Sequence, residues 1–374
     1  MAGIYIHIPF CKQACYYCDF HFSTNQALKP EMVKAIQKEL VLRQDYLEGQ
    51  PIETIYFGGG TPSLLSYSEI TGLLNTIQEK FNVSQAAEIT LEANPDDLSE
   101  KKLKELHDSG INRLSIGIQS FDNEVLLHLN RAHSSAEAIQ CLKTAQEIGI
   151  SNISIDLIYG IPGRSHTQWN KDLEQATHHR PTHISAYSLT IEPYTVFGNR
   201  VKNDKMLPPD DEQAASQFEF MTNYLREKGF EHYEISNFSL PGVYSRHNTS
   251  YWQQKHYLGV GPSAHSYNGN SRQHNIEKNA LYIKEINANT PLYTIEKLTL
   301  QDKVNEFLLT TLRTQWGADL TFLKDTYNVD VACQNSNYLN QLKVLGHIQM
   351  INNRIILTDS GKLLADKICA DLFV

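Results

Sequence analysis

The sequence predicts an α/β fold that ends in a smaller, mainly helical domain. Short runs rich in β-branched and aromatic residues recur through the first half of the 374-residue chain. Amphipathic helical patterns lie between most of them, and such alternation predicts a parallel sheet with helices outside it. Six units are fewer than a closed eight-fold barrel has, so an open partial barrel and a doubly wound sheet both fit. The expected strands are Ile4–Ile8, Ile52–Phe57, Glu88–Glu92, Asn112–Ile118, Asn152–Ile158 and His183–Leu189.

The helical patterns carry features that begin and end helices. Ser99 has the character of an N-cap residue, whose side chain accepts hydrogen bonds from free backbone N–H groups. Gly110 and Gly149 follow periodic apolar stretches, where glycine commonly ends a helix. The expected helices of this part are Glu31–Leu47, Ser68–Phe81, Ser99–Asp108, Ala136–Ile148 and Thr167–Thr177.

The character of the chain changes after Glu192, and we divide it into three parts. Residues 1–230 form the α/β core, including a helical pattern from Asp211 to Lys228. Residues 231–295 show little periodicity and are expected to pack on that core. Helical patterns resume in residues 296–374, which end in Ile348–Leu357 with Asn352-Asn353 as a hairpin turn. We therefore expect a small, winged-helix-like tail.

Composition excludes some classes of function. The chain has 33 Lys and Arg against 42 Asp and Glu, a net charge of −9, which argues against a protein dedicated to nucleic acid or to anionic membranes. No apolar run reaches the ~18 residues of a transmembrane helix. Residues Met1 to Phe10 lack the basic segment of a signal peptide. A cytoplasmic location is expected, and there cysteines are more often ligands or free thiols than disulfides.

Three of the six cysteines lie within eight residues, at Cys11, Cys15 and Cys18. Thiolates at this spacing suit an iron–sulfur cluster or zinc. Zinc would need a fourth ligand, for which His7 and His21 are available. An iron–sulfur cluster is favoured because the cysteines directly follow the first strand and lie among aromatic residues. The isolated cysteines, in helical patterns and expected to be small buried side chains, are Cys141, Cys333 and Cys369.

Polar or glycine-rich segments follow the later strands at corresponding positions. The run Gly58-Gly59-Gly60-Thr61-Pro62 follows the second strand, and glycines there allow close backbone approach to a ligand. Glu92, Gln119 and Asp156 stand at the ends of three further strands. Because a charge buried in a strand is costly unless it is paired or used, we expect these side chains to form part of a site.

The C-x3-C-x2-C spacing resembles the radical S-adenosylmethionine (SAM) superfamily. Tyr5-Ile6-His7-Ile8-Pro9-Phe10-Cys11 is similar to the opening of the oxygen-independent coproporphyrinogen III oxidase family, and the resemblance covers essentially the whole chain. It implies a partial (β/α)6 barrel with a [4Fe–4S] cluster on the three cysteines. It also implies SAM as the second cofactor, at the iron that the protein leaves open.

The resemblance also assigns roles to individual residues. It implies that Gly59, Gly60 and Thr61 contact the amino group of SAM and that Glu92 binds the ribose hydroxyls. The residues that it implies line the SAM pocket or flank the cluster are Gln119, Arg131, Asp156, Tyr5 and Tyr17.

The chain departs from the oxidases of this family in two ways. Phe20 stands where they carry a further cysteine, and the motif begins at Tyr5, without their longer preceding segment. Both differences are typical of a sister group of heme chaperones. We therefore interpret the chain as a heme-binding and heme-delivering protein, without coproporphyrinogen oxidase activity; the oxidase and a zinc-stabilised structural protein are the alternatives.

The H-N-x-x-Y pattern at His247 and Tyr251 is associated with heme binding in that group. The two residues are four apart and would share a helical face, and both side-chain types ligate heme iron. Surface hydrogen bonding is the alternative for either. The resemblance further implies an acceptor heme protein, of respiratory type, and an electron donor such as flavodoxin or ferredoxin.

Overall fold

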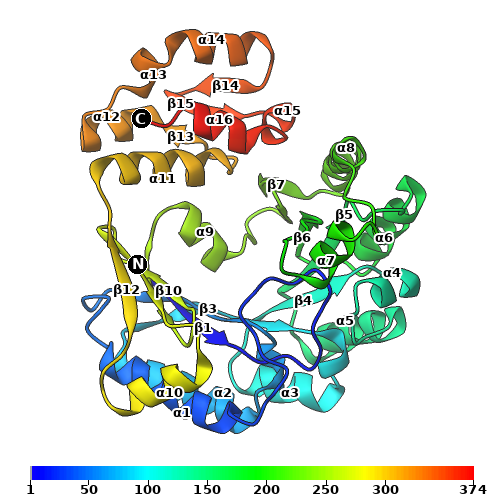
Figure 1. Cartoon of the computed structure of the whole chain (residues 1–374), viewed down its shortest axis with the longest axis vertical. Coiled ribbons are helices and arrows are strands. Elements are labelled where there is room, and N and C mark those ends of the chain that lie inside the picture. The colour runs from blue at the N-terminus through cyan, green and yellow to red at the C-terminus, as the bar shows by residue number, and fades with distance from the viewer. Residues whose placement is uncertain (1) are drawn as a thin grey trace.

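A single twelve-stranded sheet forms the body of the protein (Figure 1). The computed structural model describes residues 2–374. The strand order is β12-β11-β10-β9-β1-β2-β3-β4-β5-β6-β8-β7, and within the described part of the chain its ends do not pair, so the partial barrel is open. The expected parallel strands are confirmed as β1 (Ala2–Ile8), β2 (Ile52–Gly59), β3 (Val83–Ala93), β4 (Arg113–Gln119), β5 (Ile153–Tyr159) and β6 (His183–Ser188).

Helices cover the outer face of this sheet, and their caps agree with the sequence (Figure 1). The Ser99 side chain accepts from the Lys102 backbone N–H, and Gly149 ends its helix at φ 104°. Two short helices, α4 (Asn123–His128) and α7 (Val196–Lys202), were not expected. The other helices are α1 (Lys29–Leu42), α2 (Tyr67–Lys80), α3 (Glu100–Asp108), α5 (Ser135–Ile148), α6 (His166–His178) and α8 (Asp211–Glu227).

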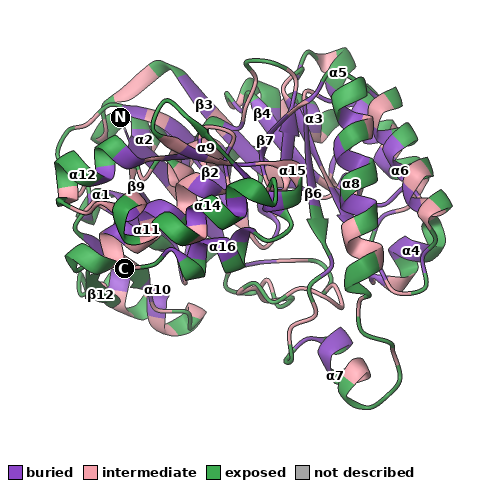
Figure 2. Cartoon of the chain, turned by 90° about the horizontal axis from the view of Figure 1, so that it is seen from above, coloured by how far each residue is buried: buried purple, intermediate pink, exposed green. Residues whose placement is uncertain are grey.

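The strands separate an apolar layer from a polar interior. Ile4, Ile6 and Ile8 of β1 are at most 1% exposed and belong to the hydrophobic core under the helices. Alternate residues point to opposite faces of a strand, so Tyr5 and His7 face the interior of the partial barrel. Figure 2 shows the buried positions concentrated along the strands and the inner sides of the helices.

Residues 231–295 extend the sheet at both edges, which the sequence pattern does not predict. Each of these strands has only three to five residues, and several are polar, so no period develops. The segment is therefore a part of the sheet itself and not only a covering for it. Its elements are β7 (Glu231–Glu234), β8 (Asn237–Ser239), α9 (Arg246–Trp252), β9 (His256–Val260), β10 (His265–Tyr267), β11 (Ser271–Asn275), α10 (Asn279–Asn287) and β12 (Tyr293–Lys297).

The fully buried carboxylate of Glu39 attaches this extension to α1. It accepts hydrogen bonds from the Tyr282 hydroxyl at 2.5 Å, the Asn275 amide at 2.8 Å and the Gly261 backbone N–H at 2.9 Å. Arg43, directly after the last residue of α1, lies 3.3 Å from the same carboxylate. Since a buried charge must be paired or hydrogen bonded, these contacts hold α10 and β11 against the first helix.

The C-terminal part has its own hydrophobic core and a three-stranded sheet of order β13-β15-β14. Asn352 and Asn353 have φ of 49° and 60°, which confirms the expected hairpin turn. The expectation that all isolated cysteines are buried is wrong for Cys333, which is exposed. The elements are α11 (Leu300–Leu312), β13 (Ala318–Asp319), α12 (Leu320–Tyr327), α13 (Val331–Gln334), α14 (Ser336–Val344), β14 (Ile348–Ile351), β15 (Arg354–Leu357), α15 (Asp359–Lys362) and α16 (Ala365–Asp371).

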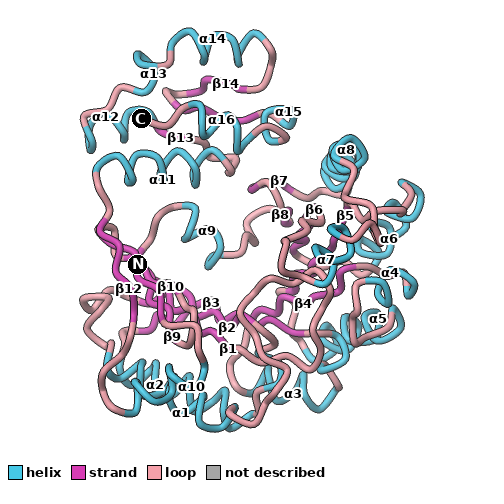
Figure 3. The backbone as a smooth tube through the Cα atoms, in the orientation of Figure 1, coloured by secondary structure: helices cyan, strands magenta, loops and turns pink. Residues whose placement is uncertain are grey.

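Helix α11 contacts strands close to both edges of the open sheet (Figure 3). Glu306 in the helix pairs with Arg272 of β11 at 2.7 Å. Just beyond the C-terminal end of the helix, Arg313 pairs with Glu234 of β7 at 3.2 Å, and the Arg313 carbonyl accepts from the Ile235 N–H. No helix within residues 2–374 is long and apolar enough to cross a membrane.

Replacing Glu39 with alanine removes the acceptor shared by these donors and leaves Arg43 without its carboxylate. Breaking a buried charge pair typically costs about 3–5 kcal/mol, so the midpoint of urea unfolding should fall markedly. Glu79→Ala, which removes an exposed carboxylate of α2, should change the free energy of unfolding by less than about 0.5 kcal/mol. Equal midpoints for the two variants would contradict the role given to Glu39.

Candidate functional site

A cavity of about 570 Å³ lies at the carboxyl ends of the parallel strands. This volume is within the range of small-molecule sites, which is about 300–1,000 Å³. The structure thus brings together in one place residues that are far apart in the sequence. Those of the expected site that line it are Cys11, Cys15, Cys18, Tyr17, Gly59, Gly60, Thr61, Glu92, Gln119, Arg131 and Asp156. Tyr5, His247 and Tyr251 do not line it.

The cysteine loop follows β1 and is held by backbone hydrogen bonds. The Cys11 N–H donates to the Ser23 carbonyl at 3.1 Å, and the Tyr16 N–H donates to the Leu129 carbonyl at 3.2 Å. All three cysteines of the loop are free and half-buried at the cavity wall. Burial raises the pKa of the Cys11 thiol to about 11, so binding of a metal cluster must release a proton there.

The histidines considered as fourth zinc ligands are already engaged. His7 is bonded through Nδ1 to the Tyr5 hydroxyl at 3.2 Å and through Nε2 to the His21 carbonyl at 3.0 Å. His21 Nε2 lies 2.9 Å from the Asn279 amide oxygen. Among the residues described, no group of three His, Cys, Asp or Glu is arranged to hold a single metal ion. In a [4Fe–4S] cluster, by contrast, each thiolate binds a separate iron atom.

Arg131 connects the cysteine loop to the neighbouring strands. Its guanidinium donates to the Asn94 side-chain oxygen at 2.5 Å and to the Gly117 carbonyl at 2.7 Å. It also lies 3.3 Å from both the Cys15 sulfur and the Tyr17 hydroxyl. A cation at this distance stabilises a thiolate electrostatically. The donor set therefore fits a negatively charged sulfur cluster at Cys15.

The glycine turn after β2 packs against the cysteine loop too closely for any side chain. A Cβ atom on Gly60 would lie 2.7 Å from the Phe10 carbonyl oxygen, and one on Gly59, where φ is 103°, would lie 2.6 Å from the His7 ring. The Thr61 N–H donates to the Phe10 carbonyl at 2.7 Å. The turn thus presents bare backbone to the cavity beside the cysteines, where a ligand with an amino or carboxylate group could be held.

Two carboxyl groups face the other wall of the cavity. Glu92 accepts from the Tyr56 hydroxyl at 2.8 Å and from the Gly59 N–H at 3.2 Å. Burial raises the pKa of Glu92 to about 7 and that of Asp156 to about 6. These groups suit hydroxyl donors such as those of a ribose. The sequence interpretation missed Tyr56, although the alternation Thr54, Tyr56, Gly58 along β2 places it on the interior side.

His247 and Tyr251 share a face of α9, as expected, but they lie in the polar interior below the cavity. The His247 ring is 1% exposed. Its Nδ1 lies 2.7 Å from the Thr54 hydroxyl and its Nε2 lies 2.8 Å from the Tyr251 hydroxyl. Because both nitrogens are hydrogen bonded, one of these bonds must open before the imidazole can bind iron.

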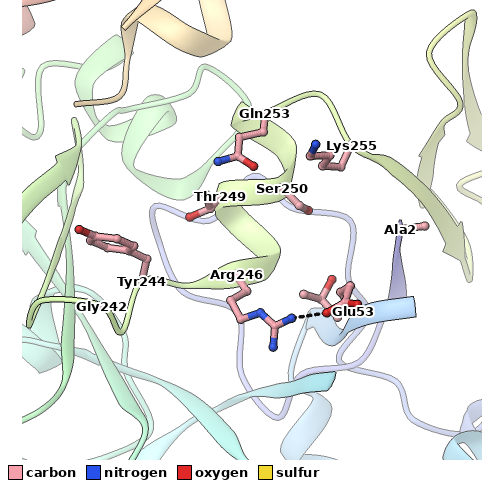
Figure 4. A pocket seen from close by; sticks show the side chains of 10 residues that line it. Ala2, Glu53, Gly242, Tyr244, Arg246, Thr249, Ser250, Gln253 and Lys255 are labelled. Carbon is pink, nitrogen blue, oxygen red and sulfur yellow. Dashed lines mark hydrogen bonds and ion pairs between the residues drawn. The ribbon is translucent and has the colours of Figure 1, made fainter. Parts of the chain in front are cut away.

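A second, smaller cavity of about 210 Å³ lies on the outer side of α9 (Figure 4). Thr249, Ser250 and Gln253 project from the helix toward it. Arg246 pairs there with Glu53 at 2.5 Å. Thr54 lines this cavity and also bonds to His247, so the His247 imidazole lies directly behind a residue of the small cavity's wall.

Comparison with known proteins agrees with this geometry. A model of the radical SAM superfamily matches residues 5–176. Heme chaperone HemW of Bacillus subtilis (strain 168) is 34% identical over 98% of this chain and 98% of its own. Heme chaperone HemW of Escherichia coli (strain K12) is 39% identical over 70% of this chain and 69% of its own. The structure of coproporphyrinogen III oxidase (HemN) from Escherichia coli, at 24% identity, covers 100% of this chain and 90% of its own with a TM-score of 0.85, a likeness of fold.

A three-cysteine loop beside a glycine turn, at the carboxyl ends of neighbouring parallel strands, is the arrangement of a radical SAM protein. Within that superfamily, the similarity over nearly the whole length is to the heme chaperones and not only to the shared barrel. The chain belongs to the HemW family.

Replacing Gly60 with alanine should disrupt the contact between the glycine turn and the cysteine loop. The new Cβ would lie 2.7 Å from the Phe10 carbonyl oxygen and 2.9 Å from the Ile8 carbonyl oxygen, and both carbonyls are held by hydrogen bonds from the turn itself. We expect SAM affinity, measured by equilibrium dialysis on anaerobically reconstituted protein, to fall at least tenfold, or about 1.4 kcal/mol. The control Gly72→Ala, in α2, meets only the flexible end of Gln37 and should leave SAM affinity unchanged. A Gly60→Ala protein with normal affinity would contradict this account.

Glu92 should make the stability of the ligand-free protein depend on pH. Its pKa is raised to about 7 from about 4.3 in an unfolded chain. Its contribution to stability is therefore complete below about pH 4 and is lost as pH rises through 7. Glu92→Gln keeps an acceptor for Tyr56 but cannot ionise. At about pH 8, urea unfolding should show Glu92→Gln to be more stable than the unmodified protein by the order of 1–3 kcal/mol. The difference in the free energy of unfolding should be smaller near pH 5. The substitution should also weaken SAM binding. A difference in the free energy of unfolding that does not change with pH would contradict the raised pKa of Glu92.

Proposed function

We propose that this protein is a heme chaperone that binds heme and transfers it to an acceptor protein, and that it carries a [4Fe–4S] cluster with exchangeable SAM. The observation that carries the proposal is the continuous similarity to Heme chaperone HemW over 98% of both chains. It is supported by Phe20, 74% exposed at the cavity, in the position where the oxidases of the wider family have a further cysteine.

In this proposal Cys11, Cys15 and Cys18 hold the cluster. Gly59, Gly60 and Thr61 bind the amino group of SAM, and Glu92 accepts hydrogen bonds from its ribose hydroxyls. When bound, the cluster supplies one-electron chemistry to SAM. The residues proposed to line the remaining SAM site or to flank the cluster are Gln119, Arg131, Asp156 and Tyr17, which line the cavity, and Tyr5, which lies outside its lining.

The protein's own contribution is to orient these groups. Arg131 holds Cys15 and Tyr17 in place while it donates to Asn94 and Gly117. Its positive charge offsets the charge of the thiolates. Glu92 is already aligned by Tyr56 and Gly59, so it is ready to accept from a ligand without moving.

Heme would be held by His247 and Tyr251 in α9. Binding of iron through Nε2 of His247 would open its bond to the Tyr251 hydroxyl, which would release both side chains as ligands at the same time. The heme acceptor is proposed to be a respiratory heme protein. The electron donor is proposed to be a flavodoxin or ferredoxin, and the location is proposed to be the cytoplasm.

One anaerobic preparation can test the chaperone against the oxidase. After reconstitution, heme binding is followed by absorbance, and coproporphyrinogen is supplied with SAM and a reductant. We expect stable heme binding, about four iron and four sulfide per chain, and no protoporphyrinogen. Robust turnover to protoporphyrinogen would defeat the chaperone proposal. Zinc without iron would defeat both functions.

His247→Ala should weaken heme binding at least tenfold, which corresponds to about 1.4 kcal/mol, because it removes a ligand to iron. The absorbance of the reconstituted cluster should not change, since the cysteine loop is separate from α9. The matched control is His107→Ala, which removes an exposed histidine of α3 and should alter neither property. Unchanged heme affinity in His247→Ala would remove this residue from the ligand set.

A further inference from the structure

Tyr56 physically joins the two ligand sites of the proposed function. Its hydroxyl donates to Glu92 at 2.8 Å, in the wall of the SAM cavity. Its ring stacks on the His247 imidazole with centroids 4.9 Å apart and an interplanar angle of 24°. We call Glu92, Tyr56 and His247 the Tyr56 bridge. Within it one phenol side chain contacts the residue assigned to ribose and the residue assigned to heme.

The bridge has little freedom to move. Tyr5 stacks on both rings, with centroids 6.1 Å from Tyr56 and 6.5 Å from His247. Gly3 of β1 is also close to the imidazole, because a Cβ added to it would lie 2.8 Å from the Thr54 hydroxyl and 3.3 Å from the His247 ring. Closely packed rings do not shift independently, so displacement of the imidazole must displace Tyr56.

The backbone of α9 is fixed where the bridge begins. Glu88 of β3 accepts from the backbone N–H groups of Arg246 and His247 at 3.1 and 3.0 Å. The start of the helix therefore cannot follow the imidazole when the Tyr251 bond opens. The change is confined to the side chains. The two rings closest to the imidazole are Tyr251, with centroids 4.8 Å apart, and Tyr56, at 4.9 Å, and of these only Tyr56 also contacts Glu92. Figure 1 shows α9 lying over the sheet that contains β2.

We propose that Tyr56 is a positioning residue that makes heme binding at His247 and SAM binding at Glu92 oppose each other. Heme would draw the imidazole out of its stack, Tyr56 would lose its hydrogen bond to Glu92, and the carboxylate would lose the donor that aligns it for the ribose. By linkage, SAM lowers the affinity for heme by the same factor. SAM then acts as a signal for heme release. The inference rests on the proposed function.

The test measures heme affinity by absorbance titration of the reconstituted protein with and without saturating SAM. We expect SAM to weaken heme binding at least fivefold, as is typical of coupled sites. Tyr56→Phe keeps the stacked ring but not the hydroxyl. In this variant the ratio of the heme dissociation constants with and without SAM should fall to about one. Tyr46→Phe is the matched control, because its hydroxyl has no hydrogen-bond partner among the described residues, and it should keep the full ratio.

A second arm needs no heme and separates this inference from the chaperone proposal. SAM affinity is measured by equilibrium dialysis for Tyr56→Phe, His247→Ala and the double variant. If Tyr56 couples the two sites, His247→Ala should change SAM affinity at least threefold in the otherwise unmodified protein. The same substitution should change it much less in the Tyr56→Phe protein.

The coupling would be overturned if the effects of Tyr56→Phe and His247→Ala on SAM affinity were additive. It would also be overturned if SAM weakened heme binding as much in Tyr56→Phe as in the unmodified protein. Tighter heme binding in the presence of SAM would overturn it as well. If no heme binds at all, the chaperone proposal and the heme part of the coupling fall together. The double-variant cycle still decides in that case whether Tyr56 transmits a change at His247 to Glu92.

Discussion

The arrangement of the site depends on the close backbone contact between the glycine turn after β2 and the end of β1. Gly60 donates to the Ile8 carbonyl at 2.9 Å, and Thr61 donates to the Phe10 carbonyl. These bonds continue the parallel pairing of β1 and β2 beyond the strands. The cysteine loop and the turn are consequently one rigid unit, whose relative position is set by backbone hydrogen bonds and not by side chains.

The interior of the partial barrel is polar where most protein interiors are apolar. Half-buried charged groups such as Arg131, Glu92 and Asp156 are costly to remove from water unless they are paired. Here the pairing is incomplete, because Arg131 Nε has no partner among the residues described. A hydrogen-bond donor without a protein partner is available to a polar ligand. The apolar layer outside the strands, which includes Ile4, Ile6 and Ile8, buries apolar surface and so offsets the free-energy cost of the polar interior.

Local chemistry in the sequence predicts the central strands and the cavity well, because a buried parallel strand and a polar strand end are both continuous in the chain. Glu92 and Asp156 are found in this way, whereas Arg131 lies in a loop and was assigned through family resemblance alone. Strands β7 to β12 escape prediction because pairing to existing edges, and not their own pattern, stabilises them. Tyr56 was overlooked because a tyrosine in a strand normally indicates packing, and only its partners in space reveal more.

Helix α11 gives the open sheet a fixed span. It pairs with β11 through Glu306, midway along the helix, and with β7 through Arg313, just past its end. These two anchors are roughly 10 Å of helix apart. A helix resists compression along its axis, so α11 keeps β7, at one edge of the sheet, apart from β11, the strand next to the other edge. The separation of β11 and β7 is thus set by a segment that contributes no side chain to the cavity, and removing one turn of α11 between Glu306 and Arg313 would draw these two strands together.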